Sequence, residues 1–298
     1  MTDLAPHELR ILVAVDREQS FTAAAVALGM SQSAVSHAVR TCERKVGAVL
    51  FERGRHGARP TPAGARAVVH ARHILHLLTT LVAEARGAET GTVTGTLRIA
   101  AFRSAAAHVL PAALAQLAAL HPGLVPQVRI VREVGRGTAG EVADGRADLG
   151  IATLDSAVPT APGLITGRLF EESYALVHPA GHTQPQSLPL VDWDENCGSY
   201  SRDWWSRQDW VPAARLNVED DIATLSMVAQ GLGMSIVPWS ALIGVPAGVT
   251  VTDLGPQGPT RQVGYVTTPE LARTIGVRAL IRELRSTALP PGLAPARA

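Results

Sequence analysis

The chain has 298 residues, enough for about two domains that each bury a hydrophobic core. The formal net charge is only +1, yet residues 1–95 hold 11 basic and 8 acidic residues, whereas the remainder holds 16 and 18. Two cysteines exclude a disulfide framework, no apolar run reaches the ~20 residues that span a bilayer, and the first ten residues lack the apolar core of a signal peptide. We therefore expect a cytoplasmic protein whose positive charge lies near its N-terminus.

Two helices joined by a tight turn are predicted for residues 20–47, behind a short helix over residues 6–17. Ser20 and Ser31 are placed to cap the two helices, and Gly47 to end the second. The outer face of the second helix is polar and suits the major groove of DNA. Its candidate DNA-binding residues are Gln32, Ser33, Ser36, His37 and Arg40. The alternative is a solvated amphipathic helix in an ordinary bundle.

A glycine-spaced basic hairpin, or wing, is predicted for residues 50–59. From Arg40 to Arg59 six basic residues stand against two acidic ones. This local positive charge suits contacts to phosphates, which hold a reading helix in register. Arg53, Arg55 and Arg59 are the candidates for these contacts.

A long helix is predicted from Pro62 to about Arg86, because Thr61-Pro62 is a cap followed by a proline in the first turn. Its apolar residues follow a heptad spacing, which favours a dimer seam over packing on its own domain. The seam residues are Ala71, Ile74, Leu78 and Leu81. His70, His73 and His76 step along the same helix by three, which we interpret as a solvated face rather than a metal site.

Strands and helices alternate from Gly95 onward, which predicts an α/β fold with a mainly parallel sheet. Expected strands cover residues 97–101, 128–134, 148–153, 169–178, 190–191, 234–238 and 263–268. Expected helices cover residues 105–120, 139–144, 222–230 and 271–284. Two lobes joined by two crossing strands would leave a cleft between them.

Candidate effector-binding residues are placed at loop ends, where a cleft would open. A guanidinium there pairs with a carboxylate in two-pronged fashion, a helix N-terminus offers free N–H groups, and an exposed indole walls a pocket for an organic, even aromatic, acid. These residues are Arg103, Ser104, Thr138, Arg202 and Trp204. The acidic run from Glu219 to Asp221 precedes a helix and suits the helix dipole, so it needs no catalytic explanation.

Residues 14–64 resemble the DNA-binding domain of LysR-type transcriptional regulators, in the words SFTAAAVALGMSQSAVSHAVR and LFERGRHGARPTPAG. Residues 95–286 resemble the effector-binding domain of that family, itself similar to periplasmic binding proteins, in GTLRIAAF, ADGRADLGIA and MVAQGLGMSIVP. His37 stands where members often have arginine, which bears on base preference.

The resemblance implies an α/β chain with an N-terminal all-α winged helix-turn-helix over residues 1–60 and a linker or dimerisation helix over residues 61–91. A two-lobed effector domain would follow over residues 92–298, with lobe one at 95–168 plus 263–286 and lobe two at 169–262. It also implies promoter DNA, a small-molecule effector and RNA polymerase as partners, a homodimer or homotetramer, no cofactor and no membrane.

Three alternatives stay open. The glycines of Gly135–Gly140 fit a dinucleotide-binding fingerprint, which would make the protein an oxidoreductase, although the preceding strand alternates polar and apolar residues. A solute-binding protein would share the two lobes without touching DNA. Cys197 in a polar loop would be a redox switch. Nucleophile elbows, zinc-protease motifs and P-loops are missing from the sequence, so we expect no enzyme.

Overall fold

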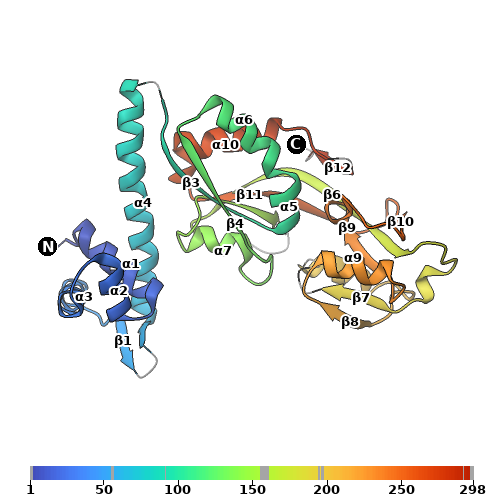
Figure 1. Ribbon diagram of the computed structural model, residues 1–298, viewed down its shortest axis with the longest axis horizontal. Helices are drawn as coiled ribbons and strands as arrows, with labels where there is room; N and C mark the ends of the chain where they lie inside the picture. Colours follow the sequence, from blue (N-terminus) through green and yellow to red (C-terminus); the bar gives the residue numbers. More distant parts are fainter. Residues whose placement is uncertain are drawn as a thin grey trace. The chain divides into compact units, whose positions relative to one another are not determined.

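The computed structural model describes residues 3–54, 57–90, 92–154, 161–193, 195, 198–290 and 292–295. Two compact units make up the chain (Figure 1). Unit 1 comprises Met1–Gly95 with Asp144–Arg146, and unit 2 comprises Thr96–Ala143 with Ala147–Ala298.

Unit 1 is a three-helix cluster followed by a hairpin and a long helix. Its elements are α1 (Pro6–Glu18), α2 (Phe21–Leu28), α3 (Gln32–Val46), β1 (Phe51–Gly54), β2 (Gly57–Pro60) and α4 (Pro62–Thr90). The hydroxyls of Ser20 and Ser31 each accept the N–H of the residue three positions later, at 3.3 and 3.2 Å. Gly29 and Gly47 end α2 and α3 at φ +65° and +77°, a region that favours glycine. The predicted caps, turn and wing of this segment are confirmed.

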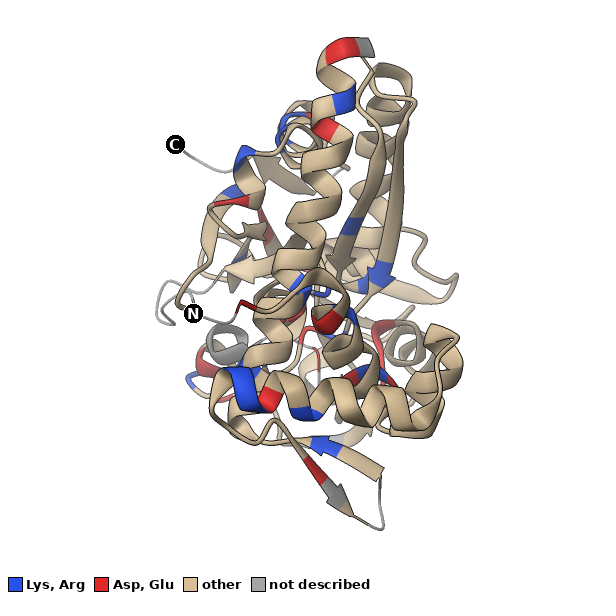
Figure 2. Cartoon of the chain, turned by 90° about the vertical axis from the view of Figure 1, so that its left-hand side faces the viewer, with Lys and Arg blue, Asp and Glu red and all other residues tan. Residues whose placement is uncertain are grey.

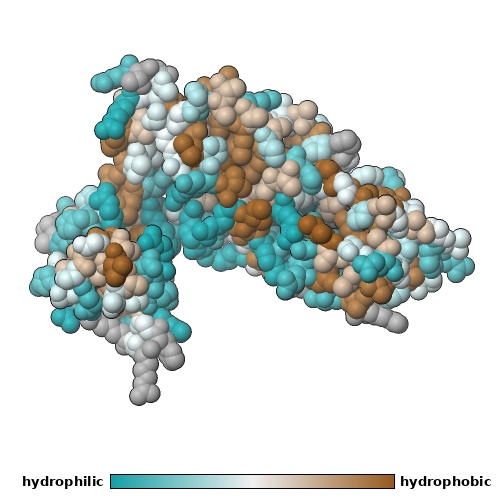
Figure 3. Space-filling model, viewed as in Figure 1, coloured by the Kyte–Doolittle hydropathy of each residue, from teal (hydrophilic) through white to brown (hydrophobic). Residues whose placement is uncertain are grey.

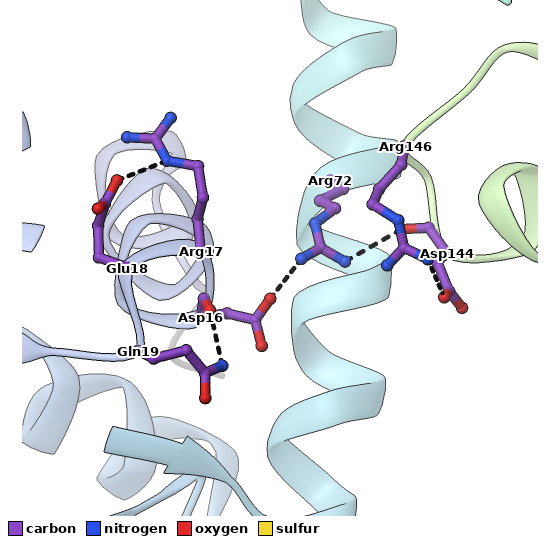
Figure 4. A network of polar contacts seen from close by, with 7 residues as sticks. All are labelled: Asp16, Arg17, Glu18, Gln19, Arg72, Asp144 and Arg146. Atoms are coloured by element: carbon purple, nitrogen blue, oxygen red, sulfur yellow. Dashed lines mark hydrogen bonds and ion pairs between the residues drawn. The ribbon is translucent and has the colours of Figure 1, made fainter. Parts of the chain in front are cut away.

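The core of unit 1 joins all of these elements. Leu12, Val15, Val35 and Leu50 are fully buried in one apolar cluster. An ion pair between Asp16 of α1 and Arg72 of α4 adds a polar contact at the edge of this cluster (Figure 4). Helix α1, which precedes the helix-turn-helix, therefore also contacts the N-terminal half of α4.

Unit 2 alternates strands and helices in its first half and is richer in strands later. Its strands are β3 (Gly95–Ala101), β4 (Leu124–Ile130), β5 (Leu149–Leu154), β6 (Ile165–Pro179), β7 (Leu190–Trp193), β8 (Ala214–Val218), β9 (Ser235–Pro238), β10 (Val249–Asp253), β11 (Thr260–Thr267) and β12 (Leu293–Pro295). Its helices are α5 (Arg103–His108), α6 (Leu110–Leu120), α7 (Gly137–Ala143), α8 (Gly198–Trp205), α9 (Asp221–Ala229) and α10 (Ile275–Ser286), with single 3-10 turns at Pro185–Ser187, Trp239–Leu242 and Leu271–Arg273.

The main sheet has the strand order β10-β6-β11-β5-β3-β4, with β9 and β12 also paired to β6. Only β3–β5 is described as a parallel pair within it, and β7–β8 is a separate parallel pair. β11 runs antiparallel to β5 and β6, and β6 runs antiparallel to β9, β10 and β12. The expectation of a mainly parallel sheet is therefore wrong. The 15-residue strand β6 pairs in both parts of the sheet and connects the lobes.

Strand β4 lies four residues earlier than expected. It contains Pro126 and is the last strand in the sheet order, where a missing N–H costs no ladder hydrogen bond. The alternating residues after Ile130 continue the strand pattern but form no strand in the structure.

Within the described part of the chain, no helix combines the length and apolarity needed to cross a membrane. The same residues include no group of three or more histidine, cysteine or acidic side chains that would hold a metal ion.

Candidate DNA-reading helix and ligand cleft

One face of α3 is exposed along its whole length. Ser33, His37, Arg40 and Arg44 are solvent-exposed and follow one another by four, three and four residues, so they form a single polar stripe. Arg44 was counted in the local positive charge but not among the candidate DNA-binding residues, and the structure places it in this exposed series. Figure 2 shows the lysine and arginine residues of the described part of the chain in blue.

Ser36 departs from the sequence-based expectation. It was expected on the outer face, but only 7% of it is exposed, because helical periodicity turns it toward the core beside Val35. Its hydroxyl accepts a hydrogen bond of 2.9 Å from the side-chain amide of Gln32, which is itself exposed. Ser36 is therefore placed to orient the side chain of Gln32.

Two carboxylates fix α3 within unit 1. Glu8 of α1 accepts from Lys45 Nζ through both oxygens, at 2.8 Å each, and this pairing holds the pKa of Glu8 below its usual value. Glu43 accepts the backbone N–H groups of Leu50 and Phe51 at 2.9 and 3.3 Å. The carboxylate of Glu43 thus ties the start of the wing to the reading helix.

The structure describes only some of the side chains of the wing. Arg59 on β2 is exposed. Arg55 and the side chain of Arg53 lie outside the described residues.

The outer half of α4 leaves its apolar residues uncovered. Ile74, Leu78 and Leu81 are 45%, 38% and 64% exposed, and Leu77 and Val82 lie beside them on the helix. Apolar atoms along α4 are visible in Figure 3. Ala71, by contrast, is buried within the single chain, which corrects its place in the predicted seam.

Unit 2 contains a narrow cleft formed by loop and strand ends. Its internal volume of about 20 Å³ admits about one water molecule, so the cleft in this structure has no room for an organic ligand. Two of the five predicted effector residues, Arg103 and Ser104, line it. The described residues that line it are Phe102, Arg103, Ser104, Glu133, Trp193, Glu195, Asp221, Pro238 and Arg261.

Arg103 is the half-exposed cation of this cleft. Its Nη1 lies 3.0 Å from Asp220 Oδ2, and its Nε lies 3.9 Å from Asp221 Oδ1. Burial raises the pKa of Asp221, and the neighbouring Asp220 adds to this, whereas Arg103 opposes it. Asp220 also caps α9 by accepting the N–H of Ala223 at 2.8 Å, whereas the sequence predicted only that this acidic run suits the helix dipole.

A buried ion pair forms the base of the cleft. Arg261 on β11 pairs with Glu172 on β6, and both side chains are almost completely inaccessible to solvent. The guanidinium of Arg261 lies 4.9 Å from the ring centroid of Phe102. Ser240 donates its N–H to Glu172 at 3.0 Å and its hydroxyl to Ser104 at 3.1 Å. These contacts link elements of both lobes to the strands that cross between them.

Thr138 is not available to a ligand, contrary to expectation. It is completely buried, and its N–H and hydroxyl both donate to Glu133 at 3.1 Å. Glu133 also accepts the N–H of Thr153 at 3.1 Å, yet burial raises the pKa of this carboxyl. A carboxylate of the chain itself therefore occupies the N-terminus of α7, where the dinucleotide interpretation would need a phosphate.

Arg202 and Trp204 are not among the described residues that line the cleft. Arg202 is 51% exposed and pairs with Asp192 at 3.3 Å. Trp204 packs on the apolar cluster of lobe two, where its ring meets that of Trp210 and its Nε1 donates to the carbonyl of Gln257 at 2.6 Å. The indole that does line the cleft is Trp193.

The remaining cleft residues carried weak signals in the sequence. Phe102 directly follows β3 and precedes the predicted Arg103, so its position in the cleft could have been predicted from the sequence. Arg261 carried no local signal, because its partner Glu172 is 89 residues away on another strand.

The structure describes only one of the two cysteines. Cys42 is buried in the core of unit 1, and burial raises the pKa of its thiol to about 11. Cys197 lies outside the described residues, so the redox interpretation stays a prediction.

Comparisons with known proteins match both parts of the chain. The model described as "Bacterial regulatory helix-turn-helix protein, lysR family" matches residues 6–65, and "LysR substrate binding domain" matches residues 90–289. A probable HTH-type transcriptional regulator, LrrA, from Synechococcus elongatus is 33% identical over 293 residues, covering 94% of this chain and 96% of the relative. A probable hydrogen peroxide-inducible genes activator from Streptomyces viridosporus is 30% identical, covering 79% of this chain and 78% of the relative.

Solved structures share the fold at lower identity. Full-length OxyR from Pseudomonas aeruginosa, solved as a variant with one cysteine replaced, is 22% identical and covers both chains completely, with a TM-score of 0.70. Full-length CbnR, solved in complex with its target DNA, is 20% identical, with a TM-score of 0.66 over 96% of this chain and all of its own.

A capped polar reading helix with a wing, followed by a two-lobed α/β domain with a cleft, defines a ligand-controlled transcription regulator. The family models cover most of the chain, and it belongs to the LysR family of DNA-binding transcriptional regulators. The protein is thus a transcription factor with an effector-binding domain and not an enzyme, as expected from its sequence.

Proposed function

We propose that this regulator reads promoter DNA with Gln32 and the exposed stripe of α3, and anchors itself on phosphates through the wing. Gln32 and Arg40 are the base-reading residues, because a side-chain amide pairs with adenine and a guanidinium with guanine. Ser33, His37 and Arg44 extend the stripe, and Arg53, Arg55 and Arg59 supply phosphate contacts. The carrying observation is the exposed series at positions 33, 37, 40 and 44.

We propose that Ile74, Leu78 and Leu81 of α4 form the seam of a homodimer, or of the dimers within a homotetramer. Three large apolar side chains that recur on one helix face and stay uncovered favour a partner helix. Pairing would present two α3 helices about 34 Å apart, one turn of DNA. The operator would be an interrupted palindrome, and the bound regulator would act on RNA polymerase in the cytoplasm. The division into residues 1–60, 61–91 and 92–298 follows these three roles.

The effector is proposed to bind in the cleft of unit 2 and to open it, because about 20 Å³ is too little for an organic molecule. An organic acid would take Arg103 from Asp220, an exchange that costs little where the arginine is 40% exposed. Glu133, Glu195 and Asp221 also line the cleft, so an acid that carries an amino group as well fits its charges better than a dicarboxylate. Differential affinity for the open and closed arrangements would couple the effector to DNA binding.

DNA footprinting beside the regulator's own gene tests the effector role, with amino acids and simple organic acids as candidate ligands. We expect one ligand class to change the footprint of the wild type but not of Arg103→Ala. Arg129→Ala, an exposed arginine outside the cleft lining, is the control. A ligand that shifts the footprints of wild type and Arg103→Ala equally would contradict the assignment of Arg103.

A further inference from the structure

A second concave site lies on unit 2, outside the cleft. It is an open groove of about 540 Å³ between the outer face of α10, the end of β11 and the turn before α10. A volume of this size lies within the range of small-molecule sites. The groove is lined by Tyr265, Ala272, Arg278, Ile281, Arg282, Arg285 and Ser286.

Three arginines dominate this groove and come from one helix face. Arg278, Arg282 and Arg285 are spaced by four and three residues, so their guanidinium groups project from the same side of α10. All three are exposed, whereas Val277 and Leu284 on the opposite side are buried. Among the described residues that line the groove, none is acidic.

Two of the arginines are held in place by neighbours. Arg282 Nε donates to the neighbouring carboxylate of Glu283 at 2.8 Å, and only 7% of the Glu283 side chain is exposed. Arg285 donates to the hydroxyl of Tyr265 at 3.3 Å, and its guanidinium lies 5.5 Å from the centroid of that ring. Such contacts reduce the rotamer freedom that a ligand would otherwise have to remove.

The ring of Tyr265 is seated by a glycine on the neighbouring strand. Gly167 is the cross-strand partner of Tyr265, and a Cβ at this position would come within 2.4 Å of the tyrosine ring. Only glycine leaves room for the ring, so the wall that supports Arg285 depends on the residue type at 167.

Arg278 is the cation without a partner. It has no ion pair and no side-chain hydrogen bond to any residue that the structure describes. A guanidinium stays charged at all physiological pH values and offers five donors in a planar fork, which suits phosphate and carboxylate oxygens. Three guanidinium groups lie on this face of α10, and the one carboxylate of Glu283 offsets only part of their positive charge.

We propose that this groove is a binding site for a small, multiply charged anion, either a phosphate ester or a polycarboxylate. Arg278 and Arg282 would hold the anionic groups, Arg285 and Tyr265 would complete the wall, and Ile281 and Ala272 would contact the apolar part of the ligand. The site is separate from the effector cleft and does not depend on the ligand assigned to it.

Isothermal titration calorimetry of the full chain with pyrophosphate and with citrate, at fixed ionic strength, tests this proposal. We expect saturable binding, weaker binding of acetate, and a loss of about tenfold or more in affinity in the double variant Arg278→Ala/Arg282→Ala. Arg282→Lys should keep part of the affinity, because it retains the charge but not the fork. Arg207→Ala removes an exposed arginine that does not line the groove and serves as the control.

The stronger of the two probes identifies the source: tighter pyrophosphate indicates a phosphate ester, and tighter citrate a polycarboxylate. Three results would overturn the proposal. They are a lack of saturable binding of either probe, affinity unchanged in the double variant, and an equal loss in Arg207→Ala. Thermal unfolding of each variant verifies that these exposed substitutions leave the fold intact.

Discussion

Lys45 Nζ lies 2.8 Å from both carboxylate oxygens of Glu8, and this contact connects the end of the reading helix α3 to helix α1. Glu8 is only 5% exposed and also accepts the N–H of Ala5 at 2.7 Å. The one lysine of the chain thus helps to fix the position of α3 within its domain.

Lys45→Met should destabilise unit 1 by about 2 kcal/mol, because the buried carboxylate of Glu8 loses its charged donor. Differential scanning calorimetry of the full chain measures the effect. Arg17→Ala, which breaks an exposed pair with Glu18, is the control and should cost under about 1 kcal/mol. Equal effects of the two substitutions would contradict the structural role of Lys45.

The ion pair between Glu8 and Lys45 predicts that the free energy of unfolding depends on pH. The pKa of Glu8 is lowered in the folded state, so its contribution is complete above the ordinary value of 4.5 and is lost as the pH falls through the lowered value. The stability difference between wild type and Glu8→Gln should therefore be constant from pH 6 to 8 and shrink below about pH 4. Thermal melts across this range test it, and a difference that grows in acid would have the wrong sign.

Ser36→Ala should weaken discrimination among DNA sites less than Gln32→Ala does. The serine only orients the amide of Gln32 through one hydrogen bond, whereas Gln32 would make the base contact, for which a loss of about 1–3 kcal/mol is expected. Competition binding with single-base variants of the operator measures both. A larger effect of Ser36→Ala would place the serine itself at the DNA.

Leu78→Asp should dissociate the dimer, because it buries a charge in the proposed seam of α4. Light scattering after size-exclusion chromatography gives the mass. His70→Asp alters an exposed residue of the same helix outside the apolar series and should leave the mass unchanged. A dimer that survives Leu78→Asp would exclude this face of α4 as the main interface.

The thiol of Cys42 should not react in the native protein. Burial raises its pKa to about 11, so few molecules carry the thiolate at pH 8. In the variant Cys197→Ser, Ellman's reagent should therefore detect the remaining thiol only after unfolding. Rapid reaction in the native state would show that the core around Cys42 opens.

The DNA-binding unit was predictable almost residue by residue, because its signals are local. The bounds of α2 and α3 are set by cap residues directly next to the helices, namely Ser20, Gly29, Ser31 and Gly47. The exposure of Ser36 was mispredicted, because around the helix it lies between the exposed residue Ser33 and the buried residue Val35, where position alone does not decide burial.

The cleft was only partly predictable, because its contacts join distant parts of the chain. Arg103 and Ser104 follow a recognisable strand, and both line it. Arg261 and Glu172 meet through strand pairing that local pattern does not encode. Thr138 was wrongly predicted to bind the effector. Glu133, five residues earlier, already accepts hydrogen bonds from its N–H and its hydroxyl.

Fluorescence anisotropy with a labelled fragment from beside the regulator's own gene tests the central claim most directly. The stripe on α3 predicts that wild type prefers this fragment over a shuffled one by about 10³-fold or more at physiological salt, and that Arg40→Ala loses most of the preference while Arg207→Ala retains it. Equal affinity of the wild type for both fragments, at low as well as physiological salt, would contradict the account.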